Sequence, residues 1–290
     1  MRNLLEIKNN NLALVIGNGI NRYNNNDNHN SWDALLSKLA QKYIPTCSER
    51  PRGVSPTEFF DALELNASTK SLQTEFCDLI KNWKPRYQHD YITKWASQNN
   101  VPILTTNFDT TLSEVRSLKL QRTIKGKFTA YYPWESYYGV DAISDPTDSF
   151  AIWHINGCKK YRQSIRLGLS HYMGSVQRAR NWLHRGGEKR LFSGNSHDAW
   201  KGSKTWLRVM FSSDLLIFGL ELGQDEVFLR WLFIERARYF KRFPDYRRNA
   251  WYVGKEGELD AGKQFFLDSV GVKTVAVSEF DDIYGEHIWK

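Results

Sequence analysis

The chain has 290 residues, of which 41% are hydrophobic, and a formal net charge of +8 at pH 7. This is enough apolar material for one large domain or two small ones. No apolar run approaches the roughly 18–20 residues that a membrane-spanning helix needs, and residues 1–11 lack the apolar core of a secretory signal. We therefore expect a cytoplasmic protein that makes no contact with a membrane.

Six short apolar runs, bounded by polar residues, are typical of strands that are buried on both faces of a sheet. They cover residues 12–16, 101–104, 151–155, 215–218, 250–253 and 272–277. Helical patterns lie between them. The sequence therefore predicts an α/β fold with a Rossmann-like, mostly parallel sheet flanked by helices, forming a single domain over residues 1–290.

A helical insertion is expected between the first and second of these strands, at about residues 31–98. Residues 55–58, Ser-Pro-Thr-Glu, have the spacing of a capping box with proline at the first helical position. Apolar residues at positions 72, 76, 79, 80 and 83 repeat with the period of a helix. Residues 24–28 and 141–148 are expected to be polar loops.

Two helices are predicted in the last third of the chain. Residues 225–240 form a candidate amphipathic helix, with Val227, Trp231 and Ile234 facing the core. Residues 263–270 form a short helix, which Gly271 is suited to end.

The three cysteines, Cys47, Cys77 and Cys158, are far apart and form no Cys-x-x-Cys pair. Zinc ribbons need cysteines paired at short spacing, so we expect no metal site and no disulfide framework. Buried free thiols in a reducing compartment are the expected state.

Positive charge is concentrated in residues 159–210, where basic residues far outnumber acidic ones and alternate with Trp182, Trp200 and Trp206. One interpretation is a surface that attracts nucleic acid, nucleotides or an acidic partner protein. The other is a solvated basic face whose tryptophans belong to the core. The composition leaves both open.

Polar turns follow three of the predicted strands, at residues 17–21, 105–109 and 154–157. Each alone has an ordinary explanation: a tight turn, a helix cap or a core histidine. The first is also an incomplete dinucleotide fingerprint, because Arg22 stands at the third glycine position. Ligands of open α/β sheets bind at the carboxyl ends of strands, so the three turns together indicate an enzyme acting on a nucleotide.

These segments resemble the sirtuin-like superfamily, in which a Gly-Ala-Gly-Ile-Ser turn, a Thr-Gln-Asn-Ile-Asp segment and a His-Gly segment line one NAD pocket. Here residues 17–21 read Gly-Asn-Gly-Ile-Asn and residues 105–109 read Thr-Thr-Asn-Phe-Asp. The closer resemblance is to bacterial sirtuin-like NAD hydrolases of antiphage defence. It extends to Ser-Trp-Asp-Ala-Leu-Leu at 31–36, to Ser-Ile-Arg-Leu at 164–167 followed by Tyr172, and to the glycine-ended strand at 215–219.

The chain departs from the family pattern at three points. Thr106 replaces the glutamine of sirtuins, and no serine follows Gly219 closely. The zinc ribbon of the deacetylating sirtuins is also absent, which disfavours the alternative of deacylation or ADP-ribosyl transfer to a protein.

The resemblance implies hydrolysis of NAD+ to nicotinamide and ADP-ribose without a metal, with a cyclised product as an alternative. Asn107 would position the ribose hydroxyls or the attacking water, Asp109 would contact the carboxamide, and His154 would be the general base. The expected cofactor-binding residues are Gly17, Asn18, Gly19, Asn21, Thr106 and Gly219.

A hydrolase that depletes NAD+ must be controlled, and the chain leaves little room for a sensor domain. We therefore expect control by a homo-oligomer or by a hetero-complex with a separate sensor or regulatory protein, with residues 159–210 as the candidate docking surface. Two rival readings are a catalytically silent nucleotide sensor and a nucleic-acid-binding protein.

Overall fold

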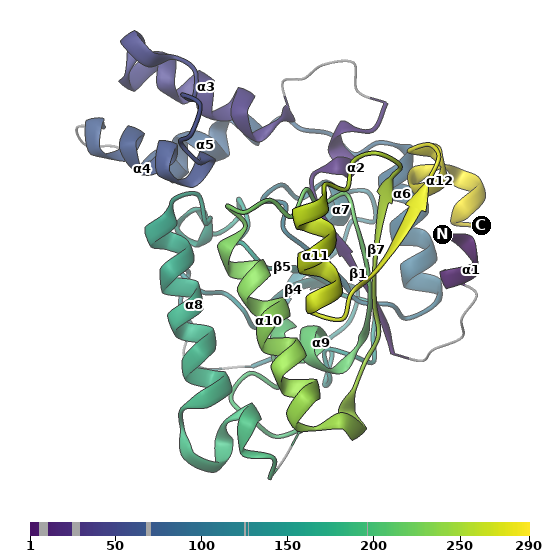
Figure 1. Cartoon of the computed structure of the whole chain (residues 1–290). Helices are drawn as coiled ribbons and strands as arrows, with labels where there is room; N and C mark the ends of the chain where they lie inside the picture. Colours follow the sequence, from purple (N-terminus) through teal and green to yellow (C-terminus); the bar gives the residue numbers. More distant parts are fainter. Residues whose placement is uncertain (6–10, 25–29, 68–70, 125, 127, 196) are drawn as a thin grey trace.

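The computed structural model describes residues 1–5, 11–24, 30–67, 71–124, 126, 128–195 and 197–290. Its centre is an eight-stranded sheet (Figure 1). In chain order the strands are β1 Leu12–Ile16, β2 Ile103–Thr105, β3 Lys119–Arg122, β4 Ser136–Gly139, β5 Ile152–His154, β6 Asp214–Phe218, β7 Ala250–Lys255 and β8 Lys273–Val277. Their spatial order is β3-β4-β5-β2-β1-β6-β7-β8.

All strand pairs from β5 to β8 across the sheet are parallel, whereas the β3–β4 and β4–β5 pairs at one edge are antiparallel. The predicted Rossmann-like α/β fold is therefore confirmed, and each of the six predicted apolar runs overlaps a parallel strand. From β1 the chain fills the sheet outward through β2 and β5. It then returns to the other side of β1 with β6, so the strand order reverses between β1 and β6. Ligands of open α/β sheets bind in the crevice at such a reversal.

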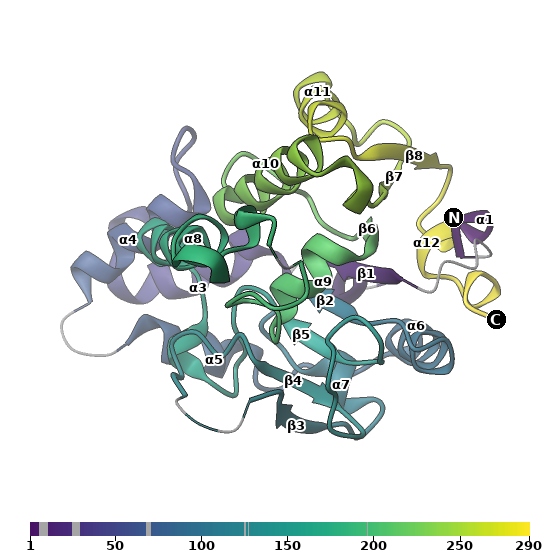
Figure 2. The same ribbon diagram turned by 90° about the horizontal axis from the view of Figure 1, so that it is seen from below.

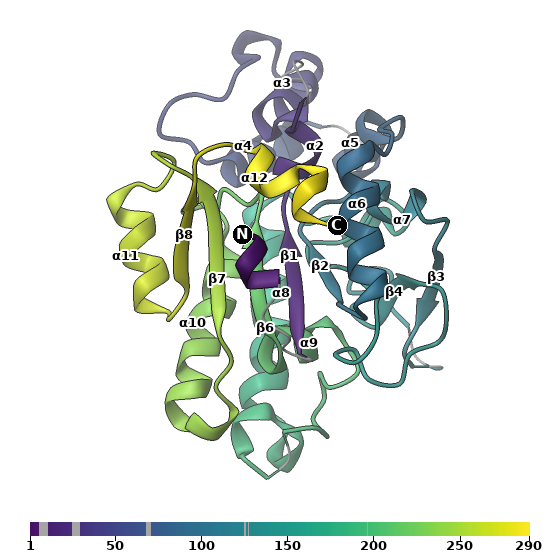
Figure 3. The same cartoon turned by 90° about the vertical axis from the view of Figure 1, so that its right-hand side faces the viewer.

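Helices cover both faces of the sheet, because alternate residues of each strand point to opposite faces. Ala13 and Val15 pack with α8 Leu169–His184, α9 Trp206–Ser212, α10 Val227–Arg242 and α11 Ala261–Ser269. Leu14 and Ile16 pack on the other face, with α6 Tyr87–Gln98, α7 Thr111–Glu114 and α12 Asp281–Tyr284. Figure 2 shows α8, α10 and α11 on one side of the sheet and α6 on the other, and Figure 3 shows α6 and α12 in front of it. The short helices α1 Arg2–Leu5 and α2 Gly19–Arg22 flank β1 in the chain.

The inserted helices α3 Trp32–Tyr43, α4 Pro56–Asn66 and α5 Leu72–Ile80 form a subdomain beyond the carboxyl ends of the parallel strands (Figures 1 and 3). Leu36, Phe60 and Phe76 lie in its own apolar cluster. The last helix of the predicted insertion, α6, instead packs against the sheet through Ile92 and Ala96. The separate helical subdomain is therefore α3 to α5, which is less than the predicted range of 31–98.

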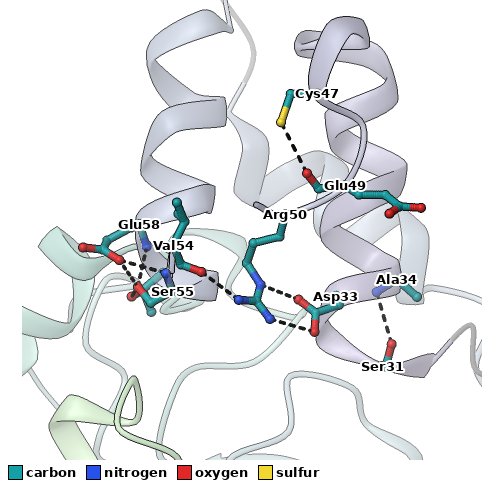
Figure 4. Close-up of polar contacts among 10 residues, drawn as sticks. Ser31, Asp33, Ala34, Cys47, Glu49, Arg50, Val54, Ser55 and Glu58 are labelled. Carbon is teal, nitrogen blue, oxygen red and sulfur yellow. Dashed lines mark hydrogen bonds and ion pairs between the residues drawn. The ribbon is translucent and has the colours of Figure 1, made fainter. Parts of the chain in front are cut away.

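Local contacts fix the beginning of α4 and join it to α3 (Figure 4). The predicted capping box is confirmed: Ser55 Oγ accepts a hydrogen bond from Glu58 N at 3.2 Å, and Ser55 N donates to Glu58 Oε2 at 2.8 Å. Arg50 contacts both carboxylate oxygens of Asp33, at 2.6 and 3.0 Å, and donates to Val54 O at 2.7 Å. The first turn of α3 is thereby fixed to the segment that enters α4.

The inward face predicted for α10 is only part of the face that the helix buries, since Trp231 and Ile234 pack against the core as predicted. Val227, Trp231 and Ile234 are only partly buried, whereas the helix buries Phe228 and Phe233 completely or almost so. The helix buries most deeply the broad apolar stripe that contains these two phenylalanines, because the larger side chains remove more apolar area from water than the predicted stripe does.

The tryptophans of residues 159–210 belong to the core, as one of the two interpretations of this region predicts. Trp200 and Trp206 are 4% and 1% exposed, and Trp182 packs against the same apolar cluster. Arg178 lies over the rings of Trp134 and Trp182. Any partner surface in this region would therefore use its basic side chains and not these indoles.

The smaller predictions have mixed outcomes. Residues 141–148 form a loop, and α11 ends before Gly271, whose φ of +73° is left-handed. Residues 25–28 of the first predicted loop lie outside the described residues. Cys77 and Cys158 are buried free thiols, and Cys47 is a partly exposed one. Along the described ranges, no helix is both long and apolar enough to cross a bilayer.

Candidate functional site

Two glycine turns interlock where β1 and β6 end. Gly19 N donates a hydrogen bond to Gly219 O at 2.8 Å, and Gly17 N donates to Phe218 O at 3.1 Å. A Cβ on Gly17 would lie 2.4 Å from Gly219 O, and one on Gly19 would lie 2.7 Å from Gly219 Cα. Gly219 itself has a φ of +68°, a conformation that favours glycine. The close approach of the two backbones by itself requires glycine at these positions.

The predicted segment 105–109 packs directly against the first glycine turn. Thr105 Oγ1 and Thr106 N both donate to Ile16 O, at 2.9 and 3.2 Å. Asn107 Nδ2 donates to Gly17 O at 3.2 Å, and the Asn107 side chain is nearly buried. Among the described residues, the Asn107 amide oxygen has no hydrogen-bond partner. This oxygen is therefore able to accept a hydrogen bond from a ligand hydroxyl or a water.

Asp109 holds the polar side chains of the first turn in place. Its Oδ2 accepts from Asn21 Nδ2 at 2.9 Å, and its Oδ1 accepts from Thr111 N at 3.0 Å. Asn21 Nδ2 also donates to Asn18 Oδ1 at 2.9 Å. Asp109 is 4% exposed and both of its oxygens are engaged within the protein. In this geometry the carboxylate orients Asn21 and caps the turn that leads into α7.

His89 of α6 completes this network and was not predicted. Arg86 N donates to His89 Nδ1 at 3.0 Å, so the proton of the neutral ring lies on Nε2. That nitrogen is 2.9 Å from Asn21 Oδ1 and donates to it, which fixes the Asn21 amide with its nitrogen toward Asp109. Burial lowers the pKa of His89 to about 4, in spite of the nearby Asp109 charge. The ring is therefore a neutral donor at physiological pH.

The third predicted turn is joined to the second through His154 and the residue that follows it. His154 Nδ1 donates to Asn107 O at 2.7 Å, and Ile155 N donates to Thr105 O at 2.8 Å. The carbonyl can only accept, so the proton of the neutral His154 ring lies on Nδ1, and Nε2 is its basic atom. Nε2 is enclosed by protein and has no hydrogen-bond partner among the described residues.

Cys158 lies beside His154 and was also not predicted as part of the site. Burial alone would lower the pKa of His154, but Cys158, the hydrogen bond to Asn107 O and the charge of Asp109 together outweigh burial, so the pKa is raised. Burial in turn would raise the pKa of Cys158, but His154 lowers it. Tyr138 Oη lies 3.8 Å from Cys158 Sγ. The only sequence signal for this group is the four-residue spacing of a histidine and a cysteine across a glycine turn.

The helical subdomain is fixed to the body next to this site. Asp61 of α4 accepts from Leu169 N at 3.0 Å, and Gln73 of α5 donates to Ile165 O at 2.7 Å. The pKa of Arg50 is raised chiefly by its hydrogen bond to Asp33, and Asp225 adds to the effect. Because Asp225 belongs to the loop between β6 and α10, the charge of this loop acts on the subdomain.

The structure brings all of the predicted site residues into one connected set at the carboxyl ends of β1, β2, β5 and β6. They are Gly17, Asn18, Gly19, Asn21, Thr106, Asn107, Asp109, His154 and Gly219. Two hollows of the described surface lie elsewhere, one beside α1 and β8 and one between α3 and α5. In the described ranges, no three His, Cys, Asp or Glu side chains are grouped so as to hold a metal ion.

No protein-family model matches the chain, and a search of curated proteins found no match. The fold and the site define an α/β protein with its polar residues at the reversal point of a Rossmann-like sheet. The likeness to sirtuin-like NAD hydrolases rests on the motifs of the sequence.

Proposed function

We propose that this chain is an NAD+ hydrolase that cleaves the nicotinamide–ribose bond and releases nicotinamide and ADP-ribose. The observation that carries the proposal is the hydrogen-bonded convergence of three turns at the strand-order reversal. There, the unpaired amide oxygen of Asn107 lies beside the first glycine turn. This is the arrangement expected for a dinucleotide that crosses the ends of β1 and β6.

In the proposed reaction the electrons of the glycosidic bond pass to the nicotinamide ring nitrogen, which becomes neutral. Positive charge develops on the ribose as an oxocarbenium ion, and water adds to it and loses a proton. Asn107 would hold the ribose hydroxyl or the water in line with the reacting carbon. Residues 17–19 would lie under the pyrophosphate. The sequence predicts that Asp109 contacts the carboxamide; because its oxygens accept from Asn21 and Thr111, we propose that it also acts by orienting Asn21.

His154 is the proposed general base, and its enclosed Nε2 sets a condition on that role. For Nε2 to reach a substrate proton, the ring must turn about its Cβ–Cγ bond and give up its hydrogen bond to Asn107 O. The raised pKa of His154 further requires a pH high enough to deprotonate the ring. The proposal therefore includes a ring rotation when substrate binds.

The test is release of nicotinamide by the purified chain and by the Asn107→Ala and His154→Ala variants. We expect each variant to lose about 100-fold or more in turnover, as is typical for removing a group that stabilises charge or transfers a proton. Matched controls are Asn99→Ala, just after α6, and His184→Ala, at the far end of α8, which should stay within about twofold of the wild type. Unchanged turnover in both site variants would refute these roles.

The same assay separates the rival functions. A silent nucleotide sensor would bind NAD+ without releasing nicotinamide. A nucleic-acid-binding protein would shift DNA or RNA in a gel, with an affinity that falls steeply as salt rises.

We further propose, from the resemblance alone, that the chain is the NAD+-depleting effector of a bacterial antiphage defence system. Self-assembly or a separate sensor protein would switch it on. Gel filtration and pulldown with the products of neighbouring genes test this proposal, since an isolated monomer with full activity would rule out control by assembly.

A further inference from the structure

Tyr284 of α12 reaches the junction of the two glycine turns. A Cβ on Gly19 would lie 2.4 Å from the Tyr284 hydroxyl oxygen, and a Cβ on Gly219 would lie 2.5 Å from it. The ring packs beside Tyr23 and Phe218, with centroid distances of 5.0 and 6.0 Å. The hydroxyl therefore lies against both turns, although it comes from the far end of the chain.

This hydroxyl lacks the partner that buried tyrosines normally have. Tyr284 is 2% exposed, but among the described residues its oxygen makes no hydrogen bond. The oxygen is nevertheless not fully enclosed by protein. Two nearby tyrosines differ: Tyr252 donates to Leu220 O, and Tyr23 donates to Asp281 at 2.5 Å.

The surroundings of the hydroxyl suit an anionic acceptor. Burial raises the pKa of Tyr284, so the group is a neutral O–H donor at physiological pH. The charges of Glu258 and Arg22 both act on Tyr284, with opposite signs. Among the described residues the Arg22 guanidinium has no hydrogen-bond or ion-pair partner, so it is able to pair with an anionic ligand. A hydrogen bond to a charged oxygen is roughly twice as strong as one to a neutral oxygen.

We propose that Tyr284 is a substrate-binding residue, whose hydroxyl donates a hydrogen bond to a pyrophosphate oxygen of the dinucleotide at the junction of the two glycine turns. This inference rests on the proposed function, because the crevice between β1 and β6 is where that ligand would lie. It makes α12 a part of the binding site.

Tyr284→Phe is the deciding variant, since it removes only the hydroxyl. Calorimetric titration with ADP-ribose should show roughly 10-fold weaker binding, the effect of one lost hydrogen bond to a charged group. The KM for NAD+ should rise by a similar factor, while kcat stays within about twofold. Without ligand the variant should unfold at the wild-type temperature, because among the described residues the hydroxyl has no partner to lose.

Tyr23→Phe is the matched control, because its hydroxyl anchors α12 through Asp281 and does not face the glycines. It should lower stability and leave the affinity for ADP-ribose within about twofold. Equal loss of affinity in both variants would show that docking of α12 is responsible and would overturn the inference.

Two further outcomes are decisive. Wild-type affinity in Tyr284→Phe overturns the inference and leaves NAD+ cleavage standing. A wild-type chain that neither binds ADP-ribose nor releases nicotinamide overturns the proposed function, and the inference with it.

Discussion

Acidification from about pH 7.5 to about pH 4.5 is expected to destabilise the chain through His89. In the folded chain, burial lowers the pKa of this ring from 6.5 to about 4. Between these two values the unfolded chain binds a proton that the folded chain does not. The free energy of unfolding must therefore fall as the pH falls through this window.

The magnitude follows from the two pKa values. At about pH 4.5 the unfolded His89 is almost fully protonated and the folded one is mostly neutral, which gives a loss of about 2–3 kcal/mol. The structure explains the penalty, because the ring is fully buried and its Nδ1 already accepts from Arg86 N. A proton on Nδ1 would place two donors against each other.

Urea unfolding of the wild type and of His89→Gln at both pH values measures this contribution. At neutral pH the variant should be less stable by about 1–3 kcal/mol, the cost of the lost hydrogen bond to Asn21. Near pH 4.5 this difference should shrink by about 2–3 kcal/mol, because the variant has no ring to protonate. If the free energies of unfolding of the two proteins fall in parallel between the two pH values, protonation of His89 is not what destabilises the fold. His171 offers a replicate, since burial also lowers its pKa to about 4.

Three other substitutions have defined outcomes. Gly19→Ala should lower the free energy of unfolding, measured in urea, by about 1–3 kcal/mol, because the added Cβ overpacks the junction of the two turns. The control Gly262→Ala in α11 should change it by less than about 1 kcal/mol. Equal effects would show that the two turns are not closely packed. Arg236 is 2% exposed and its guanidinium donates to four backbone carbonyls. Arg236→Met should therefore lower the free energy of unfolding by about 3 kcal/mol or more. An unchanged stability would show that these hydrogen bonds do not stabilise the fold. Cys158→Ser removes a charge that raises the pKa of His154. In the pH profile of the rate of nicotinamide release, the fall at acidic pH should therefore move to lower pH. An unchanged profile would show that His154 is not the base.

The sequence was sufficient for the parallel part of the sheet, because strands buried on both faces must be continuously apolar. It did not predict β3 and β4, whose residues Lys-Leu-Gln-Arg and Ser-Tyr-Tyr-Gly form no apolar run. Their pairing is fixed by contact with β5, which is a long-range property. The buried face of α10 was predicted only in part for a related reason, since its 16 residues contain more than one apolar stripe.

The convergence of the three turns was predictable, because parallel strands end at one edge of the sheet. Their partners were not. Neither His89 nor Tyr284 carries a local motif, and Cys158 has only its four-residue spacing from His154. The packing of α6, of the turn after β5 and of α12 brings these residues to the site. The sequence also assigned the glycines to ligand approach, whereas the structure shows that the two turns need them to pack against each other.

The most direct test of the central claim is a crystal structure of the chain with a carbocyclic NAD+ analogue that cannot be cleaved. If the chain is an NAD+ hydrolase as proposed, the pyrophosphate will lie over Gly17, Gly19 and Gly219, and the nicotinamide-side ring will lie beside Asn107 and His154. An analogue bound away from these turns, for example in the hollow beside α1 and β8, would contradict it.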